Sequence, residues 1–204
     1  GDPNFEVYFS AAGTEPIVLL EDSRDLTRVA FEAAGITVTK SLRGISEIKK
    51  YLNVYLGVHE AVGGDTYFIV DGDRGLREIA KTLKDGSVVS ESEGWKKYRL
   101  LDNLFVVVLP DGFAAEDLFD EWDAVLEETL DDLLNDDLTL KENIPARLSR
   151  AVDSLRKSPP ADRERARDQI RPYQDVKDRF WQRVEVDGWS ISTQHATALQ
   201  TLLA

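Results

Sequence analysis

Acidic side chains follow three apolar runs of the sequence, each at the point where the run ends. If these runs are parallel strands, their carboxyl ends meet at one edge of a sheet, where α/β proteins bind their ligands. Carboxylates gathered at such an edge repel one another, so the cluster needs a compensating cation. Mg²⁺ or Mn²⁺ suits that role, because both ions take hard oxygen ligands. The runs are residues 17–20, 67–70 and 104–109, and the acids are Glu21, Asp22 and Asp25, then Asp71 and Asp73, then Asp111, Glu116 and Asp117.

Any one of these acids also has a structural explanation. An aspartate at a strand end is most often a turn former or a helix cap. The pattern Asp71-Gly72-Asp73 is a weak signal by itself, and its place directly after an apolar run strengthens it, as does Gly75 two residues later. The chemistry therefore depends on whether the strand ends converge.

The composition leaves oxygen as the ligand for any metal. The chain has 204 residues, 25 Lys+Arg against 38 Asp+Glu and a net charge of -13, with neither Cys nor Met. The lack of Cys excludes disulfides, thiolate zinc sites and cysteine nucleophiles, and the two histidines, His59 and His195, are too far apart in sequence to indicate a histidine metal site.

The chain has the composition of a globular protein outside the membrane. A hydrophobic fraction of 42% supports a core, and the length suits one large domain or one domain with an appendage. No 18-residue apolar run is present, and Gly1-Asp2-Pro3-Asn4 begins no signal peptide, so we expect a cytoplasmic protein without a membrane partner. The absence of an initiator Met leaves open that the natural protein extends beyond Gly1.

The sequence predicts an α/β domain followed by helices. Between Pro16 and Pro110, apolar runs alternate with amphipathic stretches, which is typical of strands and crossover helices around a parallel sheet. Beyond Phe113 the chain is acidic and helical in pattern, and then rich in arginine, with a break at Pro159-Pro160. We expect an N-terminal segment (1–15), a catalytic domain (16–120) and a helical subdomain (121–204), with strands at 17–20, 36–39, 67–70 and 104–109 and a short strand at 88–89.

The acidic motifs resemble those of the Toprim domain, the metal-binding catalytic fold of topoisomerases, bacterial primases and several nucleases. That family has a glutamate after the first strand and Asp-x-Asp after a later one. Leu19–Asp25 is similar to the first motif and Ile69–Gly75 to the second. The closer resemblance is to nucleases of the OLD (overcoming lysogenization defect) family, in which phage defence or DNA repair is the usual setting.

The resemblance implies a fold and a set of site residues. The fold is a Toprim-like, Rossmann-like parallel sheet flanked by helices, with a C-terminal helical extension. In the motifs as they stand, Glu21 and Asp25 match the first, Asp71 and Asp73 the second, Gly44 the glycine turn and Glu116 a later acid. Lys177 is the candidate for a downstream functional lysine, on position alone.

The activity implied is a metal-dependent endonuclease that hydrolyses phosphodiester bonds of DNA with two Mg²⁺ or Mn²⁺ ions. Glu21, Asp71 and Asp73 are expected to bind one ion, and Asp25 and Glu116 to help hold the second. Lys177 is expected to offset charge on the scissile phosphate. Two ions about 4 Å apart stabilise both the attacking and the leaving oxygen of such a displacement.

The sequence departs from the family at two points. Asp22 stands where glycine is usual, and the chain has no Gly-x-x-x-x-Gly-Lys-Ser/Thr phosphate loop, although OLD proteins carry an ATPase domain before the Toprim domain. The ATPase is therefore expected earlier in the natural chain or in a partner chain, unless the protein is a stand-alone Toprim nuclease.

The charge pattern bears on DNA binding, because affinity for a polyanion comes mainly from Lys and Arg. If the arginines between 147 and 183 form one face, they can hold the DNA backbone, with Arg163, Arg167 and Arg171 as the candidate contacts. The alternative is that they lie on solvated helix faces, paired with nearby acids. In either case we expect weak, non-specific, salt-sensitive binding.

The acidic segment 116–137 has an apolar side, which we expect to pack within the chain. A homodimer or partner contact is the alternative. Its residues are Leu118, Trp122, Val125, Leu126, Leu130, Leu133 and Leu134.

Two other functions fit part of the pattern. A receiver-like phosphoacceptor domain begins in a similar way and would be phosphorylated on Asp71, but the expected Thr or Ser and Lys-Pro after later strands are missing. A catalytically idle Toprim-like scaffold for an ATPase partner is permitted by Asp22.

Overall fold

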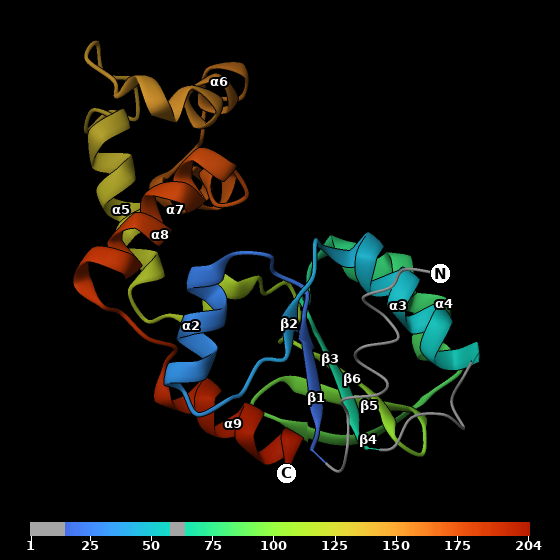
Figure 1. The fold of residues 1–204 in the computed structure, drawn as a ribbon. Helices are drawn as coiled ribbons and strands as arrows, with labels where there is room; N and C mark the ends of the chain where they lie inside the picture. The colour runs from blue at the N-terminus through green and yellow to red at the C-terminus, as the bar shows by residue number, and fades with distance from the viewer. Residues whose placement is uncertain (1–14, 58–63) are drawn as a thin grey trace. The chain divides into compact units, whose positions relative to one another are not determined.

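The computed structural model describes residues 15–57 and 64–204, so His59 lies outside the described residues. It shows an α/β protein with a mixed six-stranded sheet and a C-terminal helical region (Figure 1). The chain divides into two compact units. We call them the sheet unit, which ends at Leu118 and resumes over Ser190–Ala204, and the helical unit, Phe119–Trp189.

The sheet has the strand order β2-β1-β3-β6-β5-β4. The first four strands of this order are mutually parallel, and β5 and β4 are antiparallel additions at one end. The expectation of a parallel sheet is therefore right for three of the five strand pairings and wrong for the two made by β5, which alone runs against the other strands. The strands are β1 (Ile17–Leu20), β2 (Lys40–Ser41), β3 (Thr66–Val70), β4 (Ser87–Ser92), β5 (Trp95–Leu101) and β6 (Leu104–Val108).

The central strands β1, β3 and β6 confirm the predicted apolar runs. Every residue of these strands is buried, as expected where helices or loops cover both faces of a sheet. Because both faces of these strands are covered, their sequences are apolar throughout. A strand with one face in solvent would alternate apolar and polar residues.

One strand prediction is wrong, and another is confirmed but too short, since residues 88–89 lie within β4. Residues 36–39 form no strand: Ile36 and Val38 are buried, but the ladder to β1 begins only at Lys40. The predicted strand at 88–89 is the start of a hairpin, because Glu93 and Gly94 have φ values of 50° and 84° and so make the tight turn that joins β4 to β5. The polar sequence of this hairpin, unlike an apolar run, gave little sign of a strand.

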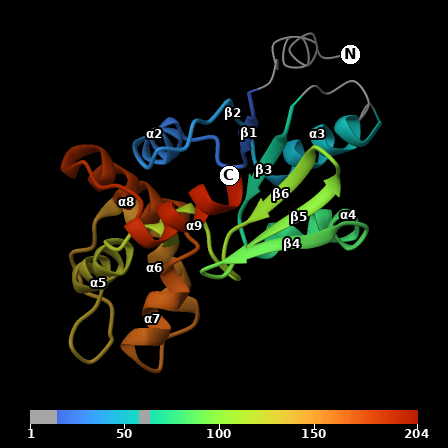
Figure 2. The ribbon, with the colours of Figure 1, turned by 90° about the horizontal axis from the view of Figure 1, so that it is seen from below.

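Helices cover both faces of the sheet (Figures 1 and 2). On one face α3 (Ile45–Gly57), with η2 (Arg74–Ile79) and α4 (Ala80–Lys84), packs in a core that contains Phe68 and Val106. The other face carries α2 (Asp25–Ala33) and α9 (Thr193–Leu203).

The last helix belongs to the sheet unit, although the sequence grouped it with the helical subdomain. Within that unit, the backbone N–H of Ser192 donates to the carbonyl of Leu118 (2.9 Å), and the buried Trp95 indole donates to Nδ1 of His195 (3.1 Å). The last turns of the chain therefore complete the sheet unit.

We expect Trp95→Phe to lower the free energy of unfolding by about 2 kcal/mol, because the substitution removes the indole N–H and leaves Nδ1 of the partly buried His195 without this hydrogen bond. Urea denaturation measures the change. Gln194→Ala is the control, since it removes an exposed hydrogen bond to Glu93 from the same helix and is expected to cost less than about 0.5 kcal/mol. Equal stability of Trp95→Phe and the parent protein would show that the indole bond contributes nothing.

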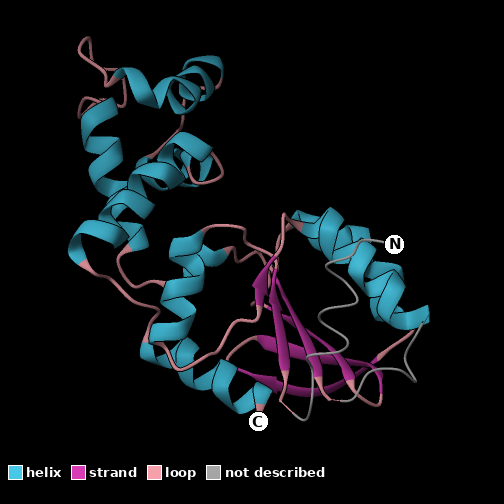
Figure 3. Ribbon diagram, in the orientation of Figure 1, coloured by secondary structure: helices cyan, strands magenta, loops and turns pink. Residues whose placement is uncertain are grey.

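The helical unit contains helices and loops but none of the six strands (Figure 3). Its core is aromatic: Phe180 contacts Phe119, Trp122 and Trp181 edge-on, with ring centroids 4.9–5.2 Å apart. The apolar side predicted for segment 116–137 is buried within the chain, which confirms intramolecular packing. The helices are α5 (Trp122–Leu133), η4 (Ala146–Leu148), α6 (Ser149–Lys157), α7 (Arg163–Ile170) and α8 (Gln174–Asp187).

The described residues include no helix long and apolar enough to cross a membrane.

Candidate metal centre

The ends of β1 and β3 bring two predicted acids together. The strands are in register, with Leu20 opposite Ile69, and the N–H of Glu21 continues the ladder to the carbonyl of Ile69 (2.9 Å). The N–H of Asp71 then donates to Oε2 of Glu21 (2.9 Å). The backbone of one acidic residue thus fixes the carboxylate of the other.

Gly72 lets the ends of β3 and β6 meet. A Cβ at this position would lie 2.1 Å from the carbonyl oxygen of Pro110 and 2.7 Å from that of Leu109. The Gly72 N–H donates to the carbonyl of Phe113, and its own carbonyl accepts from Gly112, both at 2.8 Å. Glycine is required because backbone atoms, which cannot move aside easily, occupy the space of a side chain.

We expect Gly72→Ala to destabilise the protein by about 3 kcal/mol, because the added methyl group forces two strand ends apart. Gly57→Ala is the matched control: it lies at the end of α3 with no atom within 4 Å of its Cβ position, and we expect a change below about 0.5 kcal/mol. Chemical denaturation compares the two. A Gly72→Ala protein as stable as the control would show that the loop after β6 adapts freely.

Asp73 also has a structural role. Its Oδ1 accepts from the N–H of Gly75 (2.8 Å), so the residue caps η2, and its side chain is exposed. One oxygen is committed to the cap while the carboxylate remains accessible to an ion from solvent.

Glu116 joins the site from η3 (Ala115–Leu118) and is only 1% exposed. Nη1 of Arg24 lies 3.7 Å from Oε1 of Glu116 and 2.7 Å from Oδ2 of Asp22. We call Glu21, Asp71, Asp73 and Glu116 the acid cluster. Arg24 is the residue that the sequence analysis missed, and its signal was its place as the one basic residue in the loop after β1.

Asp22 accounts for the turn in which the resembled family has glycine. Its Oδ1 accepts from the N–H of Arg24 (2.9 Å), and its other oxygen pairs with the guanidinium of the same residue. An aspartate turn of this kind organises the loop by side-chain hydrogen bonds instead of glycine geometry.

The acid cluster is coupled electrostatically. Burial raises the pKa of Glu21 to about 7, with added contributions from the charges of Asp73, Asp22 and Glu78, against the lowering effect of the Asp71 N–H. The pKa of Asp71 is raised well above its ordinary value, first by burial and then by Glu21, Asp73, Glu116 and Asp22. Within the cluster, Glu116 has the Arg24 guanidinium as a partner, whereas burial and neighbouring carboxylates disfavour the charged forms of Glu21 and Asp71.

The other predicted site residues lie outside the acid cluster. Asp25 begins α2 with its side chain 90% exposed and pairs with Arg28 at 3.7 Å. Gly44 has φ +79° and donates to the carbonyl of Glu21 (3.0 Å), so the glycine turn supports the first motif from the start of α3. Lys177 lies on α8 in the helical unit, half-buried.

The arginines proposed for DNA are paired with acids of α5. Arg163 bonds to Glu127 (2.6 Å) and to Asp131, Arg167 lies 3.6 Å from Glu127, and Arg171 pairs with Asp123 at 2.9 Å. The charges of these arginines are thus balanced inside the helical unit. This is the alternative from the sequence analysis, in which the arginines pair with nearby acids. The pairs connect different helices instead of lying along one helix. The role of these arginines at DNA stays a prediction.

The acid cluster offers the oxygen ligands that a hard divalent cation prefers, but its side chains are not positioned to hold one. All donors are carboxylate oxygens, as Mg²⁺ and Mn²⁺ prefer, and a bound ion would stabilise the charged carboxylates, whose pKa values are raised first by burial and then by mutual repulsion. However, across residues 15–57 and 64–204 no three acidic or histidine side chains are positioned together closely enough to hold a metal ion. Binding therefore requires the carboxylates to move inward.

Comparison with protein-family models, with curated proteins and with solved structures gave no match for this chain. The resemblance to the Toprim domain accordingly depends on the motifs alone.

Proposed function

We propose that this protein is a divalent-metal-dependent nuclease that hydrolyses phosphodiester bonds of DNA, as the Toprim part of an OLD-like endonuclease does. The motifs suggest this activity, and one structural observation supports it. Acids from the ends of β1 and β3 and from η3 form one coupled cluster in which the pKa values of Glu21 and Asp71 are raised. A cluster of this kind at strand ends of an α/β sheet is a candidate active site.

Each residue of the cluster has a distinct task in this proposal. Glu21, Asp71 and Asp73 would hold an Mg²⁺ or Mn²⁺ ion, and Glu116 would help hold a second together with Asp25, which lies outside the cluster at the exposed start of α2 and would have to turn toward the ion. Bound ions lower the pKa of water and neutralise the developing charge on a phosphate. The Asp71 N–H orients the Glu21 carboxylate, and Arg24 offsets negative charge at the site by pairing with Asp22 and Glu116.

Lys177 and the arginines Arg163, Arg167 and Arg171 remain proposed contacts for the phosphate and the DNA backbone. Because the net charge is -13, DNA binding by this chain is expected to be weak and salt-sensitive. An ATPase domain or partner chain, or a homodimer, would supply the further affinity that such a substrate needs.

The decisive test is incubation of the purified chain with supercoiled plasmid and Mg²⁺ or Mn²⁺. We expect nicked or linear DNA with either ion and none with EDTA. Parallel incubation with RNA identifies the nucleic acid. Plasmid that stays supercoiled at all ion concentrations, under low salt, would contradict the proposal.

The same preparation separates the alternatives. Ion binding without cleavage, measured by calorimetry, is the result expected of an idle scaffold. Covalent labelling of Asp71 by a small phosphodonor is expected of a receiver-like domain. The antiparallel pairings of β4 and β5 depart from the parallel sheet expected of both folds, so these assays, and not the topology, separate the two.

A further inference from the structure

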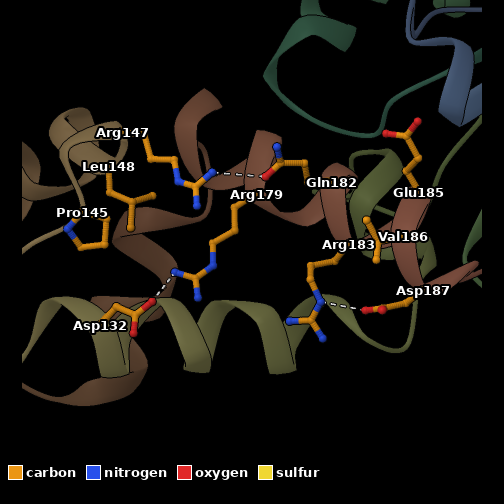
Figure 4. A pocket seen from close by; sticks show the side chains of 10 residues that line it. All are labelled: Asp132, Pro145, Arg147, Leu148, Arg179, Gln182, Arg183, Glu185, Val186 and Asp187. Carbon is orange, nitrogen blue, oxygen red and sulfur yellow. Dashed lines mark hydrogen bonds and ion pairs between the residues drawn. The ribbon is translucent and has the colours of Figure 1, made fainter.

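Three arginines line a pocket inside the helical unit (Figure 4). Arg147 comes from η4, whereas Arg179 and Arg183 lie one turn apart on α8. The cavity volume is about 530 Å³, and small-molecule sites typically measure roughly 300–1,000 Å³. The pocket therefore has the size of a site for a small ligand.

Two of these arginines are fixed by ion pairs. Arg183 bonds to Glu128 and to Asp187, both at 2.7 Å, and stacks on the Trp189 ring at 5.0 Å. Arg179 bonds through one N–H to Asp132 at 2.6 Å. A guanidinium has five N–H donors, so Arg179 retains donors beyond its ion pair.

Arg147 supplies the charge that the pocket does not balance. Its one hydrogen bond is a long one of 3.4 Å to the neutral amide oxygen of Gln182, and no carboxylate in the described part of the chain lies within ion-pair distance of it. The remaining acid of the lining, Glu185, points away from the three arginines (Figure 4). The lining has as many carboxylates as arginines, but the Arg147 guanidinium, which lies beside that of Arg179, is not ion-paired with any of them (Figure 4).

We propose that this pocket binds the phosphate group of a small ligand such as a nucleoside monophosphate. Arg147 and Arg179 are the phosphate contacts, since planar guanidinium groups donate paired hydrogen bonds to phosphate oxygens. Pro145, Leu148 and Val186 give the lining apolar surface for the uncharged part of the ligand. This binding is independent of the proposed nuclease activity.

The charge of the helical unit favours a small ligand over a nucleic acid. The unit carries more acidic than basic residues, and its net negative charge weakens the binding of a polyanion that extends along the surface, in line with the weak DNA binding proposed above. A single phosphate that enters the pocket meets the local excess around Arg147 instead.

The test is calorimetric titration of the full chain, in phosphate-free buffer, with adenosine monophosphate and with inorganic phosphate. We expect saturable binding of the monophosphate, tighter than that of phosphate because of the apolar lining. Arg147→Gln is expected to weaken it by about tenfold or more, the effect of one charged hydrogen-bond donor. Arg150→Gln, an exposed residue that follows η4 and is not part of the pocket, is the matched control and should leave binding unchanged.

Three results would overturn the proposal: no saturable binding of either probe, equal weakening by Arg147→Gln and Arg150→Gln, or binding of a DNA oligonucleotide alone. Arg179→Gln gives a second measurement, with circular dichroism to show that the variant is folded. Because Arg147 is exposed and has no ion pair, its variant decides the question even where Arg179→Gln does not fold.

Discussion

Asp71→Asn is expected to abolish metal-dependent cleavage of supercoiled plasmid, with a loss of about a thousandfold or more. The amide keeps the size of the side chain and leaves the backbone N–H that holds Glu21, so the fold and the bond at 2.9 Å are retained. What is lost is a carboxylate at the centre of the acid cluster, where burial first, and then the charges of Glu21, Asp73 and Glu116, raise the pKa of Asp71. When one of three carboxylates becomes an amide, the cation loses one negative charge and the second oxygen of that side chain, and the amide oxygen that remains is a weaker ligand.

Asp85→Asn is the matched control, because Asp85 is an exposed aspartate at the end of α4. It should cleave at the parental rate. Asp73→Ala is expected to be inactive as well, but it also removes the cap on the Gly75 N–H, so its thermal stability has to be measured beside its activity. Cleavage by Asp71→Asn at more than a tenth of the parental rate would place the active site elsewhere.

The stability of the metal-free protein is expected to fall by about 3 kcal/mol more in the parent than in Glu21→Gln as the pH rises from about 4.5 to above 7. The pKa of Glu21 is about 7 in the folded protein, against an ordinary value of 4.5. The folded protein therefore binds this proton more tightly than the unfolded chain. The stability that protonated Glu21 gives the folded protein is fully present below pH 4.5 and is lost as the pH passes 7. The pKa of Asp71 is also raised, so this residue adds to the loss.

Urea denaturation in EDTA at several pH values between 5 and 8 measures this slope. Glu21→Gln should flatten it, and Glu91→Gln, at an exposed position of β4, should not. Saturating Mg²⁺ should restore stability at pH 8 in the parent and not in Glu21→Gln, because the ion stabilises the charged carboxylates and binds only the folded protein. Parallel pH curves for the parent and Glu21→Gln would show that the Glu21 carboxyl ionises as an ordinary surface acid.

The sequence predicted the parts of the fold that depend on local pattern. The runs at Ile17, Tyr67 and Leu104 are strands because unbroken apolar segments are stable only when both faces are covered. Helix limits followed from Gly35, whose φ of +82° ends α2, and from Pro159-Pro160 between α6 and α7. The composition alone indicated that any metal ion would be bound by oxygen ligands, since the chain has no Cys and only two His.

The errors came from strands with a weak local pattern. The hairpin of β4 and β5 is polar, and its stability comes from pairing with β6 and from the turn at Glu93 and Gly94. Strand β2 is defined by hydrogen bonds to β1 and not by the apolar residues before it. Long-range pairing of this sort has no signature in a single segment of the chain.

The sequence by itself determined which acids stand at strand ends, and only the tertiary structure decided which of them interact. Glu21 and Asp71 are 50 residues apart and share a hydrogen bond because β1 and β3 are neighbours in register. Asp25, only four residues from Glu21, points to solvent because α2 has already begun. Arg24 gained its place between Asp22 and Glu116 in the same way, since burial and charge coupling depend on distance in space, which the order of residues does not specify.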